Sequence, residues 1–266
     1  MPDAQLNGHR MHYEVHGAGD PLLLTGGWGT FCHGRHVHLP EGLTDRYSVI
    51  VFDHRGIGES DDAGAPIPST RLYAADALAL LDHLGVGRSH LVGLIGMGAC
   101  ITQEMALARP GVARSLVNTG AWVAADRFLS DQLGLLLEIH RAMGWAAFQR
   151  AVMQLSFEPQ YYARNIDRLL GPQGPWGELR DRIDAHARFV QACITHDVRS
   201  RIGSIMTPTL VVHAALDQVT GPRLTRAIKE GIPGAVGHTL AAAHVIAGRP
   251  LKTEFNACLL DFLQQH

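Results

Sequence analysis

The chain has 266 residues, of which 46% are hydrophobic and 18% are charged, and its formal net charge is −2 with neutral histidines. This length and composition suit one large globular domain with a sizeable core. The sequence has no basic block interleaved with aromatic residues, so a nucleic-acid-binding surface is not expected.

The four cysteines, Cys32, Cys100, Cys193 and Cys258, are widely spaced and form no Cys-x-x-Cys pair. Such spacing favours reduced thiols over a disulfide framework or a zinc knuckle. No apolar run reaches the ~18 residues of a membrane-spanning helix, and the N-terminal residues lack the apolar segment of a signal peptide. We therefore expect a soluble, cytoplasmic protein whose partner is a small-molecule substrate, without nucleic acid, membrane or cofactor. A homodimer stays open.

The elements expected first along the chain are strands. Asn7-Gly8 is a strong signal for a two-residue hairpin near the N-terminus. The continuous apolar runs PLLLT (21–25) and YSVIVF (47–52) predict strands that are buried on both faces. Ser69 is placed to cap a helix that continues to about residue 84, where Gly85 ends it.

Strands and helices continue to alternate after this helix. The expected elements are a strand at 89–93, a helix at 97–108, strands at 114–118, 209–213 and 237–240, and helices from 222 and from 250. Such alternation indicates an α/β fold with a mostly parallel sheet covered by helices on both faces.

The region from 125 to 201 has a different sequence pattern. Long helical patterns such as FLSDQLGLLLEIHRAMG replace the alternation of strands and helices. We interpret it as an inserted helical lid above the strand ends, where open α/β sheets bind ligands. The predicted organisation is therefore a core domain formed by 1–124 and 202–266, with a lid at 125–201.

Four motifs occur in the order found in one known superfamily. They are LLLTGGWG (22–29), VIVFDHRGIGES (49–60), PTLVVHAALDQVTGP (208–222) and AAAHVIAGRPLKTEFNACLLDFL (241–263). They match, in turn, the oxyanion-loop glycines, the D-x-R-G-x-G-x-S turn, the strand before the triad acid, and the catalytic-histidine loop with the last helix. Over nearly its whole length the chain resembles the α/β-hydrolase fold superfamily, especially its small lidded esterases, enol-lactonases and polyketide-type methylesterases.

This resemblance implies that Asp217 has the position of the triad acid and His244 that of the general base. A buried carboxylate accepts the Nδ1 proton of the imidazole and leaves Nε2 free to take a proton from substrate or water. The backbone N–H groups of Met97 and of Gly27 or Trp28 would form an oxyanion hole. The alternative, that Asp217 caps a loop and His244 is a bystander, stays open.

The nucleophile of the superfamily does not carry over. The pattern G-x-Ser-x-G has three residues between its glycines, whereas Gly93 and Gly98 enclose four, none of them Ser, Cys or Asp. Counting forward from Gly93 places Ile95 at the nucleophile position, and counting back from Gly98 places Gly96 there. Because that position needs a strained backbone that glycine accepts and a β-branched residue resists, we assign it to Gly96 and keep Ile95 as the alternative.

Substitutes for the serine and residues that line the pocket are harder to identify. Cys100, one turn into the predicted helix, is expected to be a buried thiol and not a nucleophile. Thr25, Ile95 and Trp145 are candidates for contact with substrate. His36 and His38 follow the oxyanion loop, and on a strand their imidazoles would share one face and contact substrate or a metal. Without a clear third ligand we expect no metal site, and a solvated loop remains the alternative.

Together these features predict a cofactor-independent enzyme that acts on a small carbonyl compound, aromatic or polyketide-like. His–Asp base catalysis and an oxyanion hole would operate without a serine nucleophile. Hydrolysis by direct attack of water, C–C cleavage, decarboxylation and oxygenation through an enolate all remain open. The alternative is a catalytically retired fold that binds a small molecule or serves as a scaffold.

Overall fold

The computed structural model describes residues 2–62 and 66–266. An eight-stranded sheet runs through it in the order β1-β2-β4-β3-β5-β6-β7-β8. Only the pairings of β2 with β1 and with β4 are antiparallel within this sheet; the others are parallel. The strands are β1 (Asp3–Leu6), β2 (His9–His16), β3 (Asp20–Thr25), β4 (Tyr47–Phe52), β5 (Ser89–Gly93), β6 (Ala113–Thr119), β7 (Thr209–Ala214) and β8 (Val236–Leu240). The predicted mostly parallel α/β sheet is confirmed.

Helices cover both faces of this sheet. They are α1 (Thr70–His83), α2 (Met97–Ala108), α3 (Arg127–Met143), α4 (Trp145–Ser156), α5 (Pro159–Leu169), α6 (Ile183–Ile194), α7 (Gly221–Gly231) and α8 (Arg249–Gln264). Buried side chains of α1, α2 and α7 belong to one hydrophobic cluster, and those of α8 belong to a second one. None of the helices in the described residues is long and apolar enough to cross a membrane.

The continuous apolar runs of the sequence form strands whose two faces are both buried. On β3, Leu23 belongs to the first cluster, whereas Leu22 and Leu24 belong to the second. On β4, Ile50 belongs to the first cluster, whereas Val49 belongs to the second. Because successive side chains of a strand point to opposite faces, a run without polar positions is needed where helices cover both.

Local signals in the sequence correctly predicted the ends of several elements. The β1–β2 hairpin turns at Asn7 (φ 46°) and Gly8 (φ 77°), both in the left-handed region that this turn requires. Ser69 caps α1, since its hydroxyl oxygen accepts a hydrogen bond of 3.2 Å from the N–H of Leu72.

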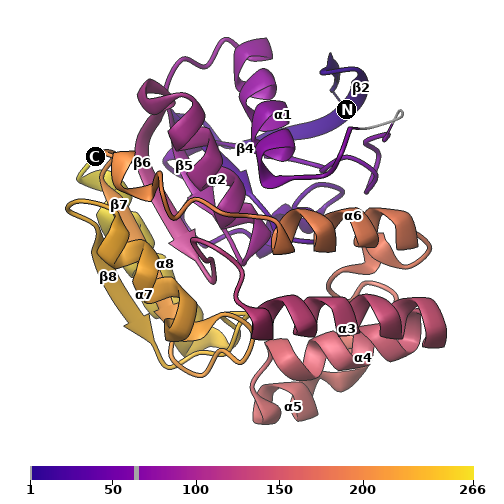
Figure 1. Ribbon diagram of the computed structural model, residues 1–266. Coiled ribbons are helices and arrows are strands. Elements are labelled where there is room, and N and C mark those ends of the chain that lie inside the picture. The colour runs from indigo at the N-terminus through magenta and orange to yellow at the C-terminus, as the bar shows by residue number, and fades with distance from the viewer. Residues whose placement is uncertain (1, 63–65) are drawn as a thin grey trace.

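Helices α3 to α6 lie between β6 and β7 in the chain, and Figure 1 shows them as one group beside the sheet. An isolated bridge between Ala124 and Asp197 joins the two ends of this segment. The N–H of Val198 also donates to the carbonyl oxygen of Val123 at 2.7 Å. These contacts hold the first and last residues of the helical segment next to each other.

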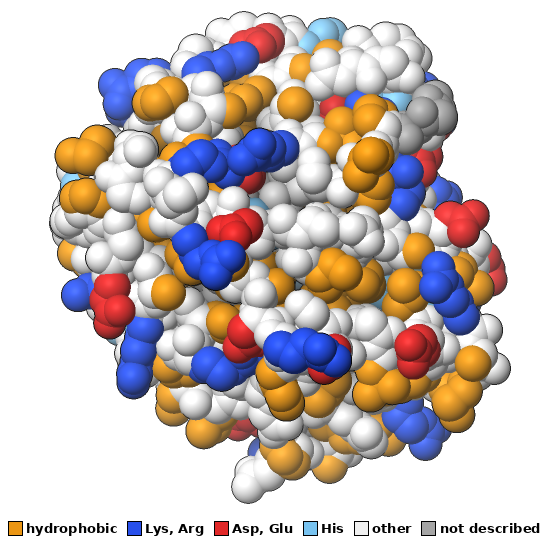
Figure 2. Space-filling model, in the orientation of Figure 1, with side chains coloured by type: hydrophobic (Ala, Val, Ile, Leu, Met, Phe, Trp, Pro, Cys, Tyr) orange, Lys and Arg blue, Asp and Glu red, His pale blue; other side chains and the backbone are white. Residues whose placement is uncertain are grey.

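Charges are mixed with apolar groups on the face seen in Figure 2, where basic, acidic and hydrophobic side chains alternate. This face carries no large basic patch of the kind that binds polyanions.

Helix α2 starts unusually close to β3, and Gly98 makes this approach possible. A Cβ atom at Gly98 would overlap the carbonyl oxygen of Thr25 and would lie 2.6 Å from that of Gly26. Because both obstacles are backbone atoms of a buried strand end, neither can move aside cheaply. The closeness of α2 to β3 thus depends on the absence of a side chain at Gly98.

We expect Gly98→Ala to lower the free energy of unfolding by about 1–3 kcal/mol, because the new methyl group forces buried backbone apart. Gly134→Ala is the matched control, since Gly134 lies within α3 and has no atom within 4 Å of a built Cβ. That substitution should raise stability by up to about 1 kcal/mol. Urea unfolding of both variants measures the difference, and equal effects would contradict the packing argument.

Candidate active site

The turn between β5 and α2 is strained at two consecutive residues. Ile95 has a φ of 59°, and Gly96 has a φ of 67° with a ψ of −111°. The N–H of Ile95 donates to Thr119 Oγ1 at 2.9 Å, and the N–H of Gly96 donates to the carbonyl oxygen of Thr119 at 3.2 Å. A β-branched residue at positive φ is rare, and here the two hydrogen bonds to the end of β6 hold it.

Gly96 directly precedes the first residue of α2. A Cβ atom built on it would lie 3.5 Å from Trp122 Cζ3 and 3.8 Å from the carbonyl oxygen of Gly120, which are ordinary contacts. Ile95 also has a positive φ, so backbone preference alone does not separate the two candidates for the nucleophile position. What separates them is that Gly96 is the N-cap of the helix, with room for a short side chain.

His244 and Asp217 form a hydrogen-bonded pair. His244 lies in the loop after β8, and its Nδ1 is 2.9 Å from Asp217 Oδ2, so it is the protonated nitrogen when the ring is neutral. The Asp217 side chain is fully buried, and 9% of the His244 side chain is exposed. Among the described residues, Nε2 of His244 has no hydrogen-bond partner, which leaves its lone pair available.

Both carboxylate oxygens of Asp217 accept hydrogen bonds from residues 219–220. The N–H groups of Val219 and Thr220 donate to its Oδ1 at 2.7 and 3.0 Å, and the Thr220 hydroxyl donates to Oδ2 at 2.7 Å. Burial alone would raise the pKa of this carboxyl, but the His244 charge and the hydrogen bonds lower that pKa well below its ordinary value. Asp217 is therefore an anion at neutral pH that orients the His244 ring.

Two cavities meet around the strained turn. The smaller cavity has a volume of about 50 Å³, and both Gly96 and His244 line it. The rest of its wall consists mostly of apolar side chains, including Trp28, Trp122 and Trp176. The larger has a volume of about 990 Å³ and shares Gly27, Trp28, Ile95 and Trp176 with the smaller one. The small cavity has space for about one or two waters, since each occupies roughly 30 Å³.

The candidate oxyanion donors lie beside the same cavity. Gly27, Trp28 and Met97 all line it. Gly27 packs so closely on the turn that a Cβ there would lie 2.6 Å from the carbonyl oxygen of Ile95. Across the described part of the chain, the N–H groups of these three residues donate no hydrogen bond to the protein. They are available to a negatively charged oxygen.

Of the four residues predicted to contact substrate, two line the cavities beside the turn and two do not. Ile95 lines both cavities and His36 lines the larger one. Thr25 is fully buried in β3 and is not part of either lining. Trp145 lies in a separate surface pocket with His140 and Arg180, because the first turn of α4 packs on that side.

His36 and His38 do not lie on a strand, the conformation in which their imidazoles would have shared one face. Residues Arg35–His38 form a short 3-10 helix that follows Gly34, whose φ of 79° reverses the chain. The two imidazoles therefore do not alternate along a strand, and His36 stacks on His16 with ring centroids 4.3 Å apart. The glycine at 34 is the local turn signal that disfavours a strand here.

Cys100 is fully buried, as expected of a packing thiol. Its Sγ lies 3.7 Å from the carbonyl oxygen of Trp122, and burial raises the pKa of the thiol well above its ordinary value. A thiol in this state is a poor nucleophile.

Sequence reasoning missed two residues that support the site. Thr220 supplies two hydrogen bonds to Asp217, and its Oγ1 lies 3.4 Å from His244 Nδ1. Thr119 holds the strained turn. The available signal was their position, since Thr119 ends a strand and Thr220 comes just before the expected helix at 222.

With this geometry in place, comparison with known proteins identifies the family. The family model described as Serine aminopeptidase, S33 matches residues 32–244. The chain belongs to this family, within the α/β-hydrolase fold superfamily. The family model is named for a serine enzyme, whereas the turn after β5 here contains no serine.

Curated relatives match almost end to end. A protein of Azorhizobium caulinodans named "Putative carbamate hydrolase RutD" is 32% identical over 98% of both chains. A protein of the same name from Stutzerimonas stutzeri is 29% identical over 96% of this chain and 97% of its own length. In fold, the chain is similar to the enol-lactonase of Burkholderia xenovorans, with a TM-score of 0.86, 23% identity and coverage of 99% and 100% of the two chains.

We expect Asp217 to make folding stability depend on pH. Its pKa in the folded chain is below the value near ~4 of an unfolded aspartate, so its ionised form stabilises the fold above that pH, and this contribution is lost as the pH falls toward the folded pKa. The stability difference between the wild type and Asp217→Asn should therefore be largest near neutral pH and shrink below pH ~4.

Urea unfolding at a series of pH values measures this difference. Asp131→Asn is the control, because Asp131 is an exposed partner of Arg127 on α3 and should contribute little at any pH. A difference for Asp217→Asn that stays constant down to pH ~3 would show that its carboxylate is not stabilised by the fold.

Proposed function

We propose that this chain is a cofactor-independent hydrolase in which His244 activates water and no side chain attacks the substrate. The observation that carries this proposal is the Asp217–His244 pair, joined at 2.9 Å, beside a cavity whose wall contains Gly96, our candidate for the nucleophile position of the superfamily pattern. A protein of this fold that had lost its activity and only bound a ligand would have no chemical need for a buried carboxylate that orients an imidazole beside Gly96.

The chemistry follows from the tautomer that Asp217 imposes. Nε2 of His244 removes a proton from a water in the small cavity, and the resulting hydroxide attacks the carbonyl carbon. The carbonyl oxygen becomes an oxyanion that accepts hydrogen bonds from the N–H of Met97 and of Gly27 or Trp28. The imidazolium then returns its proton to the leaving group, so the base is regenerated and no acyl-enzyme forms.

Direct attack of water is favoured over the other reactions that the sequence left open, because the relatives are named hydrolases. C–C cleavage, decarboxylation and oxygenation would use the same base on a C–H or O–H of the substrate. Product analysis separates these routes. Hydrolysis of an ester, lactone or carbamate adds one solvent oxygen at a C–O or C–N bond, whereas C–C cleavage and decarboxylation break a C–C bond of the substrate and oxygenation consumes dioxygen.

We propose a small carbonyl compound with an aromatic or polyketide-like body as the substrate. Supporting this, Trp28 and Trp176 line both cavities, and Phe157 and Tyr161 line the larger one. Flat apolar groups favour flat apolar ligands. The names of the relatives add carbamates and enol-lactones as the first compounds to assay.

We further propose that the segment 125–201 acts as a lid, with 1–124 and 202–266 as the core domain. The segment contributes Leu129 of α3, Val152 of α4 and Trp176, which lies between α5 and α6, to the wall of the small cavity. The carbonyl oxygen of Ser156, the last residue of α4, accepts a hydrogen bond of 2.8 Å from the N–H of Val245. This contact is next to His244 in the chain, so the lid and the histidine loop support each other.

We expect His244→Ala and Asp217→Asn each to lower kcat/KM by about 10²–10⁴-fold on any carbonyl compound that the protein hydrolyses. The first removes the base, and the second loses the carboxylate that selects its tautomer. His83→Gln is the control, because His83 is an exposed residue at the end of α1 and should leave kcat/KM unchanged. Hydrolysis that survives His244→Ala at the wild-type rate would refute the mechanism.

A serine-directed fluorophosphonate probe tests the absence of a nucleophile. The wild type should remain unlabelled, whereas Gly96→Ser should become labelled, because the strained position beside His244 then holds a hydroxyl. Labelling of Gly96→Ser should disappear when His244→Ala is added. Stoichiometric labelling of the wild type would show that another residue attacks the substrate, and an unlabelled but folded Gly96→Ser would place the nucleophile position elsewhere.

A further inference from the structure

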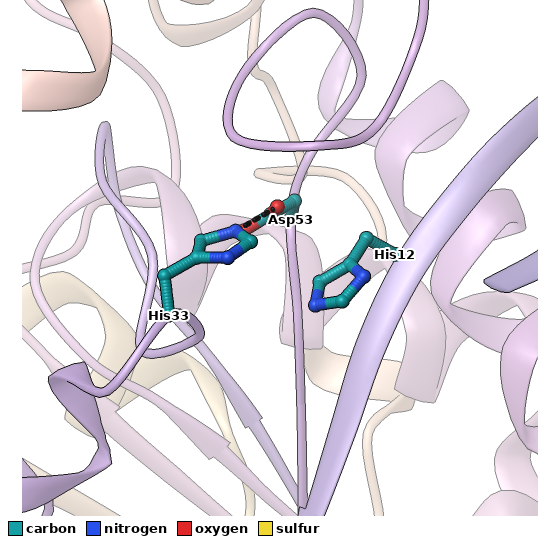
Figure 3. Close-up of side chains that lie close together, drawn as sticks. All are labelled: His12, His33 and Asp53. Carbon is teal, nitrogen blue, oxygen red and sulfur yellow. Dashed lines mark hydrogen bonds and ion pairs between the residues drawn. The ribbon is translucent and has the colours of Figure 1, made fainter. Parts of the chain in front are cut away.

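A cluster of imidazoles and carboxylates lies apart from the cavity that holds His244. His12 lies on β2, His33 follows β3, and Asp53 directly follows β4. One nitrogen or oxygen of each lies within 4.8 Å of the other two. Figure 3 shows the three side chains gathered around one spot, with the hydrogen bond between His33 and Asp53 drawn. No sequence motif connects these three residues, which lie in three separate segments.

Two buried polar atoms in the cluster have no partner. The side chains of His12 and Asp53 are fully buried. Within the described residues, His12 Nε2 and Asp53 Oδ1 make no hydrogen bond. Leaving a polar atom unpaired in the interior is costly, so such atoms usually indicate a ligand or an ordered water.

Negative charge is in excess around the two imidazoles. Three further carboxylates surround them: Asp3, Glu14 and Glu59. Glu59 lies 3.6 Å from Nδ1 of His12 and 3.6 Å from Nδ1 of His33. Of the arginines and lysines that the structure describes, only Arg10 pairs with any of these carboxylates or with Asp53, through Asp3 at 3.1 Å. The surroundings therefore favour a bound cation.

We propose that His12, His33 and Asp53 bind one divalent cation of the Zn²⁺ class. Two imidazole nitrogens with a carboxylate oxygen suit zinc and its first-row neighbours, whereas Mg²⁺ and Ca²⁺ prefer oxygen ligands alone. His12 Nε2 and Asp53 Oδ1 are the two unpaired atoms that the ion would satisfy. Glu14 Oε1, 3.6 Å from His12 Nε2, supplies a fourth ligand.

Binding requires a small, defined change at His33. Its Nε2 now shares a proton with Asp53 Oδ2 at 2.6 Å. Neighbouring ligand atoms in a tetrahedral zinc site are roughly 3.3 Å apart, given metal–ligand distances near 2.0–2.1 Å. Because 2.6 Å is too short for two ligand atoms, binding of the ion to His33 Nε2 breaks this hydrogen bond and leaves Asp53 Oδ1 as the carboxylate ligand. The ring proton of His33 then lies on Nδ1, 3.6 Å from Glu59. Protons compete with the ion for the two imidazole nitrogens, so affinity falls as the pH is lowered.

The cation would be structural and would take no part in the reaction. It joins β2, the loop after β3 and the end of β4, three segments that are far apart in the chain. The neighbour of Asp53, His54, places Nε2 3.0 Å from the carbonyl oxygen of Gly26, at the start of the loop with the candidate oxyanion donors. An ion at Asp53 therefore stiffens the support of that loop, and this inference holds whether or not His244 activates water.

The test is titration of the chelator-stripped full chain with ZnCl2 by calorimetry, with bound metal counted by elemental analysis. We expect one tightly bound equivalent and a rise in Tm. His33→Asn should weaken the affinity by at least about 10–100-fold. Asparagine is chosen because His33 has a φ of 58°, which asparagine tolerates better than most residues, so the loop should keep its shape.

His38→Gln is the matched control, since His38 lies in the same loop region but outside the cluster. It should bind Zn²⁺ as the wild type does. Absence of a bound equivalent in the wild type, as expected if only a water fills the site, would overturn the proposal, as would an equal loss in His38→Gln. Visible absorption of Co²⁺ added to the stripped wild type gives a readout independent of any variant. Intense tetrahedral bands support the site, and the weak spectrum of hydrated Co²⁺ contradicts it.

Discussion

The strained turn between β5 and α2 is the constraint on which the candidate site depends. Ile95 and Gly96 both have positive φ, and both N–H groups bond to Thr119 at the end of β6. On the other side, Gly98 lets α2 approach the backbone of Thr25 and Gly26. The turn is thus fixed between β3 and β6 by backbone contacts and by the Thr119 hydroxyl, and none of these contacts needs a nucleophilic side chain in the turn.

This explains how the site keeps its shape without a serine. In serine hydrolases the strain aims a side chain at the substrate. Here the same strain leaves Gly96 without a side chain, and the space it does not fill becomes part of a cavity of about 50 Å³ beside His244. Met97, the first residue of α2, also lines that cavity. The proposed reaction would use the base and the backbone donors of the superfamily without covalent attack.

Regular elements were predictable because their signals are local. The apolar runs of β3 and β4, the Asn7-Gly8 turn and the cap at Ser69 each depend on a few adjacent residues, and the structure has them where the sequence places them. The motifs gave the superfamily for the same reason. The conformation of residues 36–38 stayed open, and there the structure has a short 3-10 helix that follows Gly34.

Contacts between distant segments were beyond local signals. Trp145 lies in a surface pocket and not above His244, because the packing of α4 on α3 decides which way its first turn faces. Thr119 and Thr220 gain their roles only when β6 and the start of α7 come beside the turn and the acid. The His12 cluster joins three segments that no motif connects.

The sequence by itself determined the fold class, the order of strands and helices, the positions of Asp217 and His244, and the absence of a serine between Gly93 and Gly98. Each of these is written in adjacent residues or in a motif. Only the tertiary structure decided that Ile95 adopts a left-handed conformation, that Asp217 is held at both oxygens, and that His12, His33 and Asp53 meet. These depend on hydrogen bonds and packing between segments far apart in the chain, which periodicity and spacing do not record.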